Sequence, residues 1–173
     1  MAGQAQAVIF DRDGTLVEDV PYNGDPDRVV PVAGARATLD RLRAGGLALA
    51  VVSNQSGVGR GLLTLEQVDA VNHRIEELLG PLGPWFVCPH APDDGCTCRK
   101  PRPGLILDAA AALGVDASAC VVVGDQPSDV DAAHAAGARS ILVTQNGADR
   151  GGSRDSAIAG DLEEVADLVL GRS

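Results

Sequence analysis

Two carboxylates stand two residues apart directly after the first apolar run of this 173-residue chain. The run covers 7–10, and Asp11 and Asp13 follow it, with Gly14 and Thr15 next. A short apolar run bounded by turn residues is typical of a buried parallel strand, so we expect both acids at its carboxyl end, where open α/β sheets bind ligands. Neighbouring carboxylates repel each other there, and a bound cation or a reaction that needs two differently protonated carboxyls would offset that cost. A turn in which Asp and Gly only relieve backbone strain is the alternative interpretation.

Three later segments carry polar side chains that point to the same site. The apolar run 47–52 ends at Ser53, and the run 120–123 is followed by Gly-Asp, which places Asp125 at another strand end. Between these two runs stands Lys100, inside an Arg-Lys-Pro segment. Because carboxyl ends of parallel strands meet at one edge of a sheet, we expect Ser53 and Asp125 to emerge near Asp11 and Asp13.

A second cluster has the composition of a metal site. Cys88, His90, Cys96 and Cys98 follow the pattern C-x-H-x5-C-x-C, which supplies three thiols and an imidazole, a complete tetrahedral set for Zn²⁺. Disulfides or unrelated buried thiols are the alternatives, although no secretion signal supports disulfides. We expect a structural zinc in the 88–98 loop, because the protein supplies all four ligands and leaves no position open for water.

The zinc loop leads directly into two cations. We expect the metal to hold this loop so that Arg99 and Lys100 face the carboxylates, and a solvated basic pair that balances Asp93 and Asp94 is the alternative. The remaining cysteine, Cys120, lies in an apolar run and is expected to be a small core residue.

Charge and composition limit the partners. The formal net charge is −10, which argues against non-specific nucleic-acid binding, so a phosphorylated metabolite would have to be drawn by local cations. No basic segment followed by an apolar one opens the chain, and no apolar run approaches the roughly 20 residues of a membrane span. We therefore expect a cytoplasmic monomer with a small-molecule substrate and no nucleic-acid or membrane partner.

Strands and helices alternate along the chain, which predicts a three-layer α/β sandwich with a central parallel sheet. A capping box at Thr64–Gln67 opens one helix, with Val68, Val71, Ile75 and Leu78 at helical spacing. The whole chain, 1–173, is read as one domain without a large cap, in which loops alone cover the site. The expected strands are 7–11, 47–53, 85–88, 120–124 and 140–143, and the expected helices are 33–44, 64–80, 103–113, 127–136 and 161–170.

Three connecting segments are expected to be irregular. The 18–31 loop is long for an α/β connection and is expected to supply specificity contacts. The Gly-rich segment 57–61 is interpreted as a mobile loop facing the substrate, with Arg60 as a weak phosphate candidate. The segment 146–156 is expected to be mobile because it is rich in Gly, Asp and Ser.

The ordered motifs resemble the haloacid dehalogenase (HAD) superfamily of phosphotransferases, and the resemblance covers nearly the whole chain. Asp11-Arg-Asp-Gly-Thr, Ser53-Asn-Gln-Ser-Gly and Cys88-Pro-His with Cys-x-Cys-Arg-Lys-Pro look like the D-glycero-D-manno-heptose-1,7-bisphosphate phosphatases and the related histidinol-phosphate phosphatases. Two departures are visible. Ser53 stands where the family more often has Thr and keeps the hydroxyl, and Gln126 stands where Lys or Ser is common.

The resemblance implies a phosphatase with an aspartyl-phosphate intermediate on Asp11. Asp13 is expected to protonate the leaving alcohol and then to activate water. Ser53 and Lys100 are expected to hold phosphoryl oxygens. Mg²⁺, which prefers oxygen ligands, is assigned to the Asp11 carboxylate, the Asp13 main-chain carbonyl and the Asp125 carboxylate.

Substrate contacts are expected from several positions. Backbone amides at 12 and 13 are further phosphate donors, Asn54 and Gln55 are expected to orient the substrate, and Arg99 is expected to reach its far part. The substrate-binding candidates are Arg12, Asp19, Tyr22, Asn54, Gln55, Ser56, Arg99 and Gln126.

Three further residues are not assigned a direct role in catalysis. Asp129 either orients Asp125 or caps the following helix, and the residue pattern does not choose between these roles. His73 is expected to be exposed, and His134 is expected to pack in its Ala-rich helix.

Two other functions compete with the sugar-bisphosphate phosphatase. Histidinol phosphate as the substrate would keep the same chemistry. A receiver-like domain that signals through a long-lived phosphoaspartate would share the sheet and the strand-end acids, but Asp13 and the zinc loop argue against it.

Overall fold

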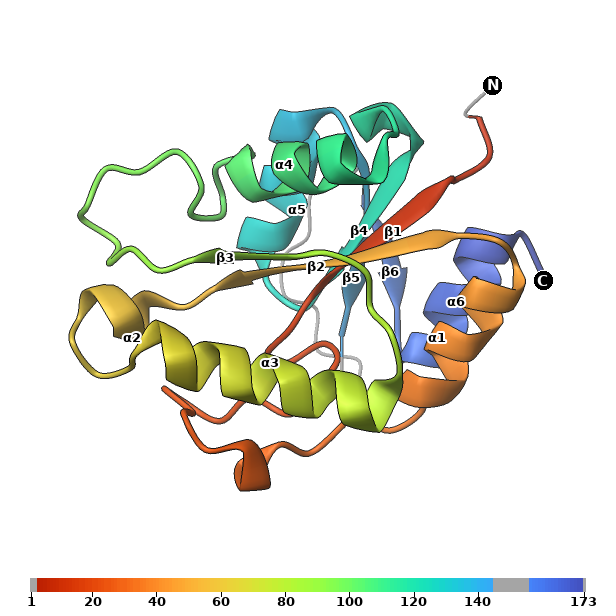
Figure 1. Cartoon of the computed structure of the whole chain (residues 1–173). Helices are drawn as coiled ribbons and strands as arrows, with labels where there is room; N and C mark the ends of the chain where they lie inside the picture. Colours follow the sequence, from red (N-terminus) through yellow and green to blue (C-terminus); the bar gives the residue numbers. More distant parts are fainter. Residues whose placement is uncertain (1–2, 145–155, 173) are drawn as a thin grey trace.

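The computed structural model describes residues 3–144 and 156–172, and within them a six-stranded parallel sheet runs through the molecule (Figure 1). Its order, β3-β2-β1-β4-β5-β6, is that of a doubly wound α/β sheet, with the chain reversing its direction of growth between β1 and β4. The three-layer expectation is confirmed. The strands are β1 Ala7–Asp11, β2 Ala48–Asn54, β3 Trp85–Cys88, β4 Cys120–Gly124, β5 Arg139–Val143 and β6 Ala157–Ala159.

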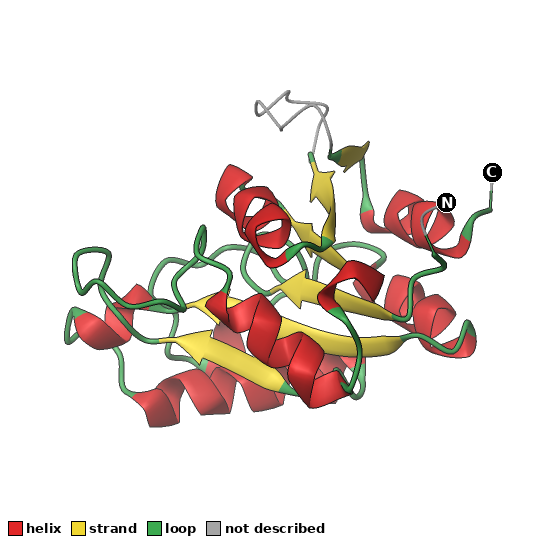
Figure 2. Cartoon of the chain, turned by 90° about the horizontal axis from the view of Figure 1, so that it is seen from above, coloured by secondary structure: helices red, strands yellow, loops and turns green. Residues whose placement is uncertain are grey.

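Helices cover both faces of the sheet (Figures 1 and 2). One face is covered by α1 Ala35–Ala44, α3 Leu65–Leu79 and α6 Leu162–Leu170, and the other by α4 Gly104–Leu113 and α5 Pro127–Ala136. A short helix, α2 Ser56–Gly59, follows β2, and 3₁₀ turns occupy Pro26–Arg28 and Ala117–Ala119.

β1 explains why an uninterrupted apolar run forms the central strand. Val8 and Phe10 join the core under α1, α3 and α6, whereas Ala7 and Ile9 join the core under α4 and α5. Side chains of a strand alternate between its two faces, so a strand covered on both faces is apolar nearly throughout, and in β1 the polar residue Asp11 comes only at the carboxyl end. This alternation also influences which face of the sheet the side chains directly after the strand point toward.

The predicted helices and strands are largely confirmed, with local differences. The Thr64 capping box is present, since Thr64 Oγ1 accepts from the Gln67 backbone N at 3.1 Å and Gln67 Oε1 accepts from the Thr64 backbone N at 3.0 Å. On α3, Leu79 is buried in the core, while Leu78 is only partly buried. The last buried residue of this helix is therefore Leu79, where the sequence predicted Leu78. β6 was not predicted because it is only three residues long. The predicted mobile segment lies outside the described residues, apart from Ser156.

Loops cover the carboxyl edge of the sheet, as predicted. The connection from β1 to α1 contains one 3₁₀ turn and no cap domain. The predicted mobile loop at 57–61 is instead partly helical, because Ser56–Gly59 forms a single turn packed on the loop after β3. Gly59 donates its backbone N–H to Pro89 O at 2.7 Å. Within the described residues, none of the helices combines the length and the apolar character that a membrane span requires.

Candidate active site and metal centres

A cavity of about 330 Å³ opens at the carboxyl edge of the sheet, where β1, β2 and β4 end. β1 pairs with β2 and β4, with Phe10 opposite both Val51 and Val123, so the residues after all three strands emerge side by side. The cavity brings together most of the predicted site. Its lining residues are Asp11, Arg12, Asp13, Asp19, Val20, Pro21, Tyr22, Asn54, Gln55, Ser56, Gly57, Lys100, Gln126, Ser128 and Asp129.

Lys100 lines this cavity with a buried side chain. Its Nζ is 2.7 Å from Asp11 Oδ1 and 2.6 Å from Asp129 Oδ1, and the residue is only 4% exposed. The Asn54 side chain binds the backbone of Lys100 through two hydrogen bonds. Its Nδ2 donates to Lys100 O at 3.2 Å, and its Oδ1 accepts from Lys100 N at 3.1 Å. The Asn54 amide therefore positions the lysine, and a substrate contact from it stays a prediction.

The buried charges shift one another's pKa values. Burial raises the pKa of Asp11 well above its usual value, the Lys100 ammonium opposes that rise, and the carboxylates of Asp129 and Asp125 add to it. Burial disfavours the Lys100 ammonium, but Asp11 and Asp129 outweigh this effect and raise its pKa. A cation beside Asp11 would favour the ionised form that a nucleophile needs.

Asp13 is held by hydrogen bonds to both of its carboxylate oxygens. Arg12 Nε donates to Oδ1 at 3.0 Å, and Gln55 Nε2 donates to Oδ2 at 2.7 Å. Gln55 Nε2 also donates to Ser53 Oγ at 2.8 Å, so this amide links the predicted acid–base residue to the predicted phosphate-binding hydroxyl. Gln55 is buried and acts here as a connector, a role that its sequence position alone did not indicate.

The Arg12 side chain lies in the protein interior. It is 1% exposed, and its Nη1 donates to Asn72 Oδ1 of α3 at 2.8 Å. A substrate contact from position 12 is therefore left to the backbone amide, as the sequence interpretation had placed it.

Three carboxylates form a candidate metal centre in which Asp129 accompanies Asp11 and Asp125. One oxygen from each lies within 4.8 Å of the others, and oxygen donors in such a group suit Mg²⁺. Thr15 Oγ1 donates to Asp125 Oδ1 at 3.2 Å and Gln126 Nε2 donates to Oδ2 at 3.0 Å, which fixes this carboxylate. The Asp13 carboxylate is directed elsewhere, which is consistent with a ligand role for its carbonyl alone.

Asp129 has the helix-capping role. Its Oδ2 accepts from the Gln126 backbone N at 3.1 Å in a capping box of α5, while its Oδ1 accepts from Lys100. Gly124 makes this possible, because a Cβ at position 124 would collide with the Asp129 carboxyl. Capping of α5 thus places a buried carboxylate beside the lysine.

The four predicted zinc ligands converge. One ligand atom from each residue lies within 4.8 Å of the others. His90 Nδ1 is 3.4 Å from Cys88 Sγ and 3.3 Å from Cys98 Sγ. The sulfurs of Cys88 and Cys96 are 3.7 Å apart. A tetrahedral zinc with bonds of about 2.3 Å to sulfur separates two sulfurs by about 3.8 Å. The donor set and its spacing therefore fit zinc. Cys120 is buried in β4, away from this cluster, as predicted.

The zinc loop supports the cavity at both ends. At its start, Cys88 O accepts from the Gln55 backbone N at 2.8 Å, and at its end it leads to Lys100. A contact between Arg99 and the far part of the substrate stays a prediction. Arg99 is absent from the described lining of the cavity, and among the described residues its buried Nη1 has no hydrogen-bond partner.

The 18–31 loop contributes Asp19 and Tyr22 to the cavity wall, as predicted. Partial desolvation raises the pKa of Asp19, and the carboxylates of Asp13 and Asp125 raise it further. Tyr22 is half-exposed and has a φ of 51°, a backbone conformation that non-glycine residues seldom adopt. Ser56 and Gln126 also line the cavity, whereas Arg60 is exposed and lies outside its described lining.

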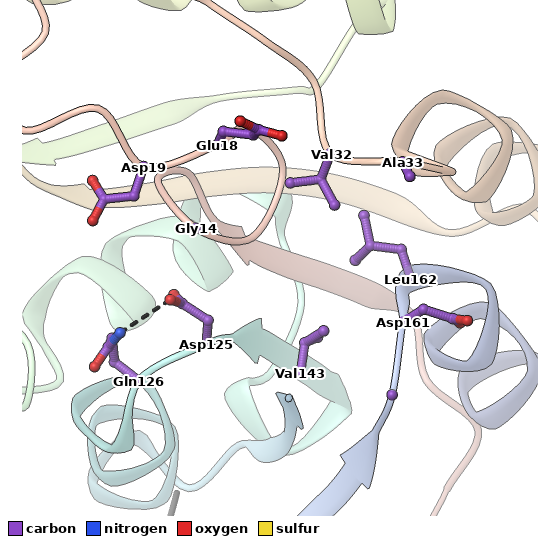
Figure 3. A pocket seen from close by; sticks show the side chains of 11 residues that line it. Gly14, Glu18, Asp19, Val32, Ala33, Asp125, Gln126, Val143, Asp161 and Leu162 are labelled. Atoms are coloured by element: carbon purple, nitrogen blue, oxygen red, sulfur yellow. Dashed lines mark hydrogen bonds between the residues drawn. The ribbon is translucent and has the colours of Figure 1, made fainter. Parts of the chain in front are cut away.

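A second hollow of about 640 Å³ adjoins the first, shares Asp19 and Gln126 with it, and is also lined by Asp125 (Figure 3). Glu18 and Asp161 add further carboxylates around it, so its wall is acidic. Sequence reasoning did not anticipate this hollow, because the start of α6 reaches it only through tertiary packing. Its lining residues are Gly14, Glu18, Asp19, Val32, Ala33, Asp125, Gln126, Val143, Gly160, Asp161 and Leu162.

The two histidines outside the candidate zinc site, His73 and His134, lie on the surface. His73 is exposed, as predicted. His134 was predicted to pack inside its helix, but it is exposed, and its Nε2 lies 3.2 Å from Ser140 Oγ.

Several known proteins with related sequences and structures are named as phosphatases. A family model described as HAD-hydrolase-like matches residues 97–169. D-glycero-β-D-manno-heptose-1,7-bisphosphate 7-phosphatase of Bordetella bronchiseptica is 35% identical over 94% of this chain and 97% of its own length. The Pseudomonas aeruginosa protein of the same name is 38% identical over 79% of both chains.

Solved structures agree with this relationship. The D,D-heptose 1,7-bisphosphate phosphatase of B. bronchiseptica, complexed with magnesium and phosphate, has a TM-score of 0.88 and 34% identity, and the match covers 96% of this chain and 98% of that one. The corresponding phosphatase of Burkholderia thailandensis has a TM-score of 0.71 and 26% identity, with 96% of this chain and 99% of that one covered.

The doubly wound sheet, with strand-end carboxylates gathered about one lysine, defines a HAD-type phosphatase, an enzyme that hydrolyses phosphoric monoesters. At the identity and coverage of these relatives, the chain belongs to the family of D-glycero-D-manno-heptose-1,7-bisphosphate 7-phosphatases.

Proposed function

We propose that the protein hydrolyses a sugar bisphosphate, D-glycero-D-manno-heptose 1,7-bisphosphate, through an aspartyl-phosphate on Asp11. The observation that carries this proposal is the convergence of Asp11, Asp13 and Lys100 in one cavity, with Ser53 tied to Asp13 through Gln55. The named activity of the relatives supports the choice of substrate.

Asp11 Oδ attacks phosphorus and forms an acyl phosphate, while the bond from phosphorus to the sugar oxygen breaks. Asp13 donates a proton to that leaving oxygen, and then takes one from the water that hydrolyses the intermediate. Ser53 and Lys100 hold phosphoryl oxygens by a hydroxyl and an ammonium, so the charge that builds up on them is neutralised. In the second half-reaction the water oxygen attacks phosphorus and the bond from phosphorus to Asp11 breaks, so the two half-reactions together return Asp11 and Asp13 to their starting states.

A magnesium ion at the carboxylate cluster would be held by Asp11 and Asp125 and by the Asp13 carbonyl, and Asp129 is the third carboxylate of that cluster. When bound, it supplies positive charge that offsets repulsion between the carboxylates and the phosphate. The fit is chemical, because the cluster consists of oxygen donors, two of the three carboxylates are buried, and among the described residues Lys100 supplies the one ammonium paired with them.

Zinc has a structural role in this proposal. The ligands Cys88, His90, Cys96 and Cys98 would close a loop that has little regular secondary structure between β3 and α4. Because this loop ends at Lys100, its closure would fix the cation of the active site.

A phosphate-release assay tests the proposal directly. Wild-type protein with Mg²⁺ is expected to release phosphate over many turnovers, fastest from the heptose bisphosphate, and Asp11→Asn is expected to lower turnover by at least about 10³-fold because the nucleophile is lost. Circular dichroism and melting curves check that the variant is folded. Full activity in this variant would reject the assignment of Asp11.

The same assay distinguishes the competing functions. Histidinol phosphate is measured beside the sugar phosphates, and a higher kcat/KM for it would replace the substrate in this proposal. A phosphoaspartate that persists for minutes without turnover would instead favour a receiver-like signalling domain.

A further inference from the structure

A line of buried hydrogen bonds runs from the Asp13 carboxylate into the helix layer. Asp13 Oδ1 accepts from Arg12 Nε at 3.0 Å, and on the far side of the guanidinium Nη1 donates to Asn72 Oδ1 at 2.8 Å. Asn72 belongs to α3 and is absent from the described lining of the cavity. A helix residue remote from the substrate is thus connected to the acid–base group.

The position of Arg12 follows from the strand before it. Phe10 faces the layer that contains α3, and because side chains alternate, the residue two positions on is directed toward the same layer. Arg12 is 1% exposed, so its guanidinium has little access to water and needs partners within the protein. Asp13 supplies the opposite charge on one side, and Asn72 supplies an acceptor on the other.

Packing alone does not account for an asparagine at position 72. It is 7% exposed and lies on the buried face of α3 among Val68, Val71 and Ile75, which form an apolar stripe. A buried amide is costly unless it is hydrogen-bonded, and Arg12 provides that bond. The amide is therefore matched to the guanidinium.

We propose that Asn72 is a positioning residue for catalysis: by fixing Arg12, it holds the Asp13 carboxylate in the orientation needed for proton transfer to the leaving oxygen. This inference rests on the proposed function. Gln55 restrains the other oxygen of Asp13 at 2.7 Å, so removal of Asn72 leaves the carboxylate attached on one side with the Arg12 side free to turn.

The test compares two substrates that differ in their need for an acid. Asn72→Leu keeps the approximate size of the side chain and removes the acceptor. For the sugar phosphate, kcat/KM is expected to fall by about 10-fold or more, because general acid catalysis contributes about 10²–10⁴-fold. For p-nitrophenyl phosphate, whose phenolate leaves without protonation, kcat/KM is expected to fall by no more than about twofold. An equal loss for both substrates, or none for either, would overturn the proposal.

Two further variants separate positioning from stability. Asn72→Asp retains an acceptor oxygen at the same place, so it is expected to keep kcat/KM for the sugar phosphate well above that of Asn72→Leu; a loss as large as in the leucine variant counts against the inference. Val68→Ala, at a buried position of the same helix, removes core packing alone. It is expected to lower Tm without changing the ratio of the two kcat/KM values.

A spectroscopic measurement shows whether the Arg12 side chain is held in place, even if Asn72→Leu fails to fold. In the ¹⁵N spectrum of the wild-type protein, Arg12 Nε–H is expected to exchange slowly with water, unlike Nε–H groups of exposed arginines, and Asn72→Asp is expected to keep this protection. Fast exchange in the wild type would show that Arg12 is not fixed. If wild-type protein hydrolyses neither substrate, the proposed function fails, and the exchange measurement still tests the link from Asn72 to Asp13.

Discussion

The ammonium of Lys100 lies 2.7 Å from Asp11 and 2.6 Å from Asp129, so one buried cation is shared by two buried carboxylates. Such a group is costly to desolvate, and it persists because each charge has a close partner. Asp125 has neutral partners instead, a hydroxyl from Thr15 and an amide from Gln126. The protein thus has less positive charge here than negative, which suits a site completed by a divalent cation and a phosphate.

Lys100→Met tests this dependence at the scale of a single residue. Loss of the cation is expected to lower kcat/KM by about 10²-fold or more, and to lower the free energy of unfolding by about 3 kcal/mol in the absence of Mg²⁺. Phosphate release and urea unfolding in EDTA measure the two effects. Arg60→Met is the control, since Arg60 is exposed and outside the described cavity lining, and both quantities should stay near wild type. A Lys100→Met protein as stable and as active as this control would contradict the role of Lys100.

The elements of the fold place these charges through close backbone packing. The turn after β1 brings Gly14 against Asp125 from the end of β4, and a Cβ at position 14 would collide with that carboxylate. The start of α5 brings Asp129 over Gly124 in the same way. Two glycines therefore set how closely the strand ends approach each other, and with them the spacing of the candidate magnesium ligands.

Gly14→Ala tests this role of the turn, with Gly137→Ala as a matched control. Both glycines have φ of +80°, so alanine strains the backbone equally, by about 1 kcal/mol. Only position 14 adds a collision, since nothing lies within 4 Å of a Cβ at position 137. Gly14→Ala should therefore weaken activation by Mg²⁺ and lower turnover, whereas Gly137→Ala should lower Tm alone. An unchanged Mg²⁺ dependence in Gly14→Ala would contradict this account.

At the scale of the whole molecule, a short stretch of chain joins the two candidate metal sites. Cys98 is two residues before Lys100, and Cys88 O accepts from the backbone of Gln55, which holds Asp13 and Ser53. The zinc loop thus contacts both sides of the active-site cavity. A loop closed by metal adds to folding free energy, because the site does not exist in the unfolded chain.

Removing both metals and then adding them back separately tests this connection between the zinc loop and the active site. After chelation and dialysis, Mg²⁺ alone is expected to restore little activity, whereas Mg²⁺ with Zn²⁺ restores most of it, because Lys100 is misplaced until the loop closes. Elemental analysis of freshly purified protein should find one zinc per chain. Cys98→Ser should lose zinc and activity together, while Cys120→Ala, at a buried thiol outside the cluster, should keep both. Full activity of zinc-free protein with Mg²⁺ alone would contradict the structural role.

Much of the architecture follows from local sequence. Apolar runs bounded by polar residues mark β1, β2 and β4 because strands buried on both faces are apolar until they reach the edge of the sheet. The capping box at Thr64, and the thiols and imidazole of the zinc loop, are short-range patterns that need no knowledge of distant contacts. The acids at 11, 13 and 125 were expected at the carboxyl edge for the same reason, since the end of a strand fixes where its next residue emerges.

Tertiary structure alone decided which partner each side chain has. That Arg12 is bound to Asn72, that Gln55 links Asp13 to Ser53, and that Asp129 shares Lys100 with Asp11 all depend on segments far apart in the chain. A hydrogen bond forms only within about 3 Å, whereas strand and helix patterns place side chains only to a face or an edge. The sequence therefore determined where the charged groups gather, and three-dimensional packing determined which of them touch.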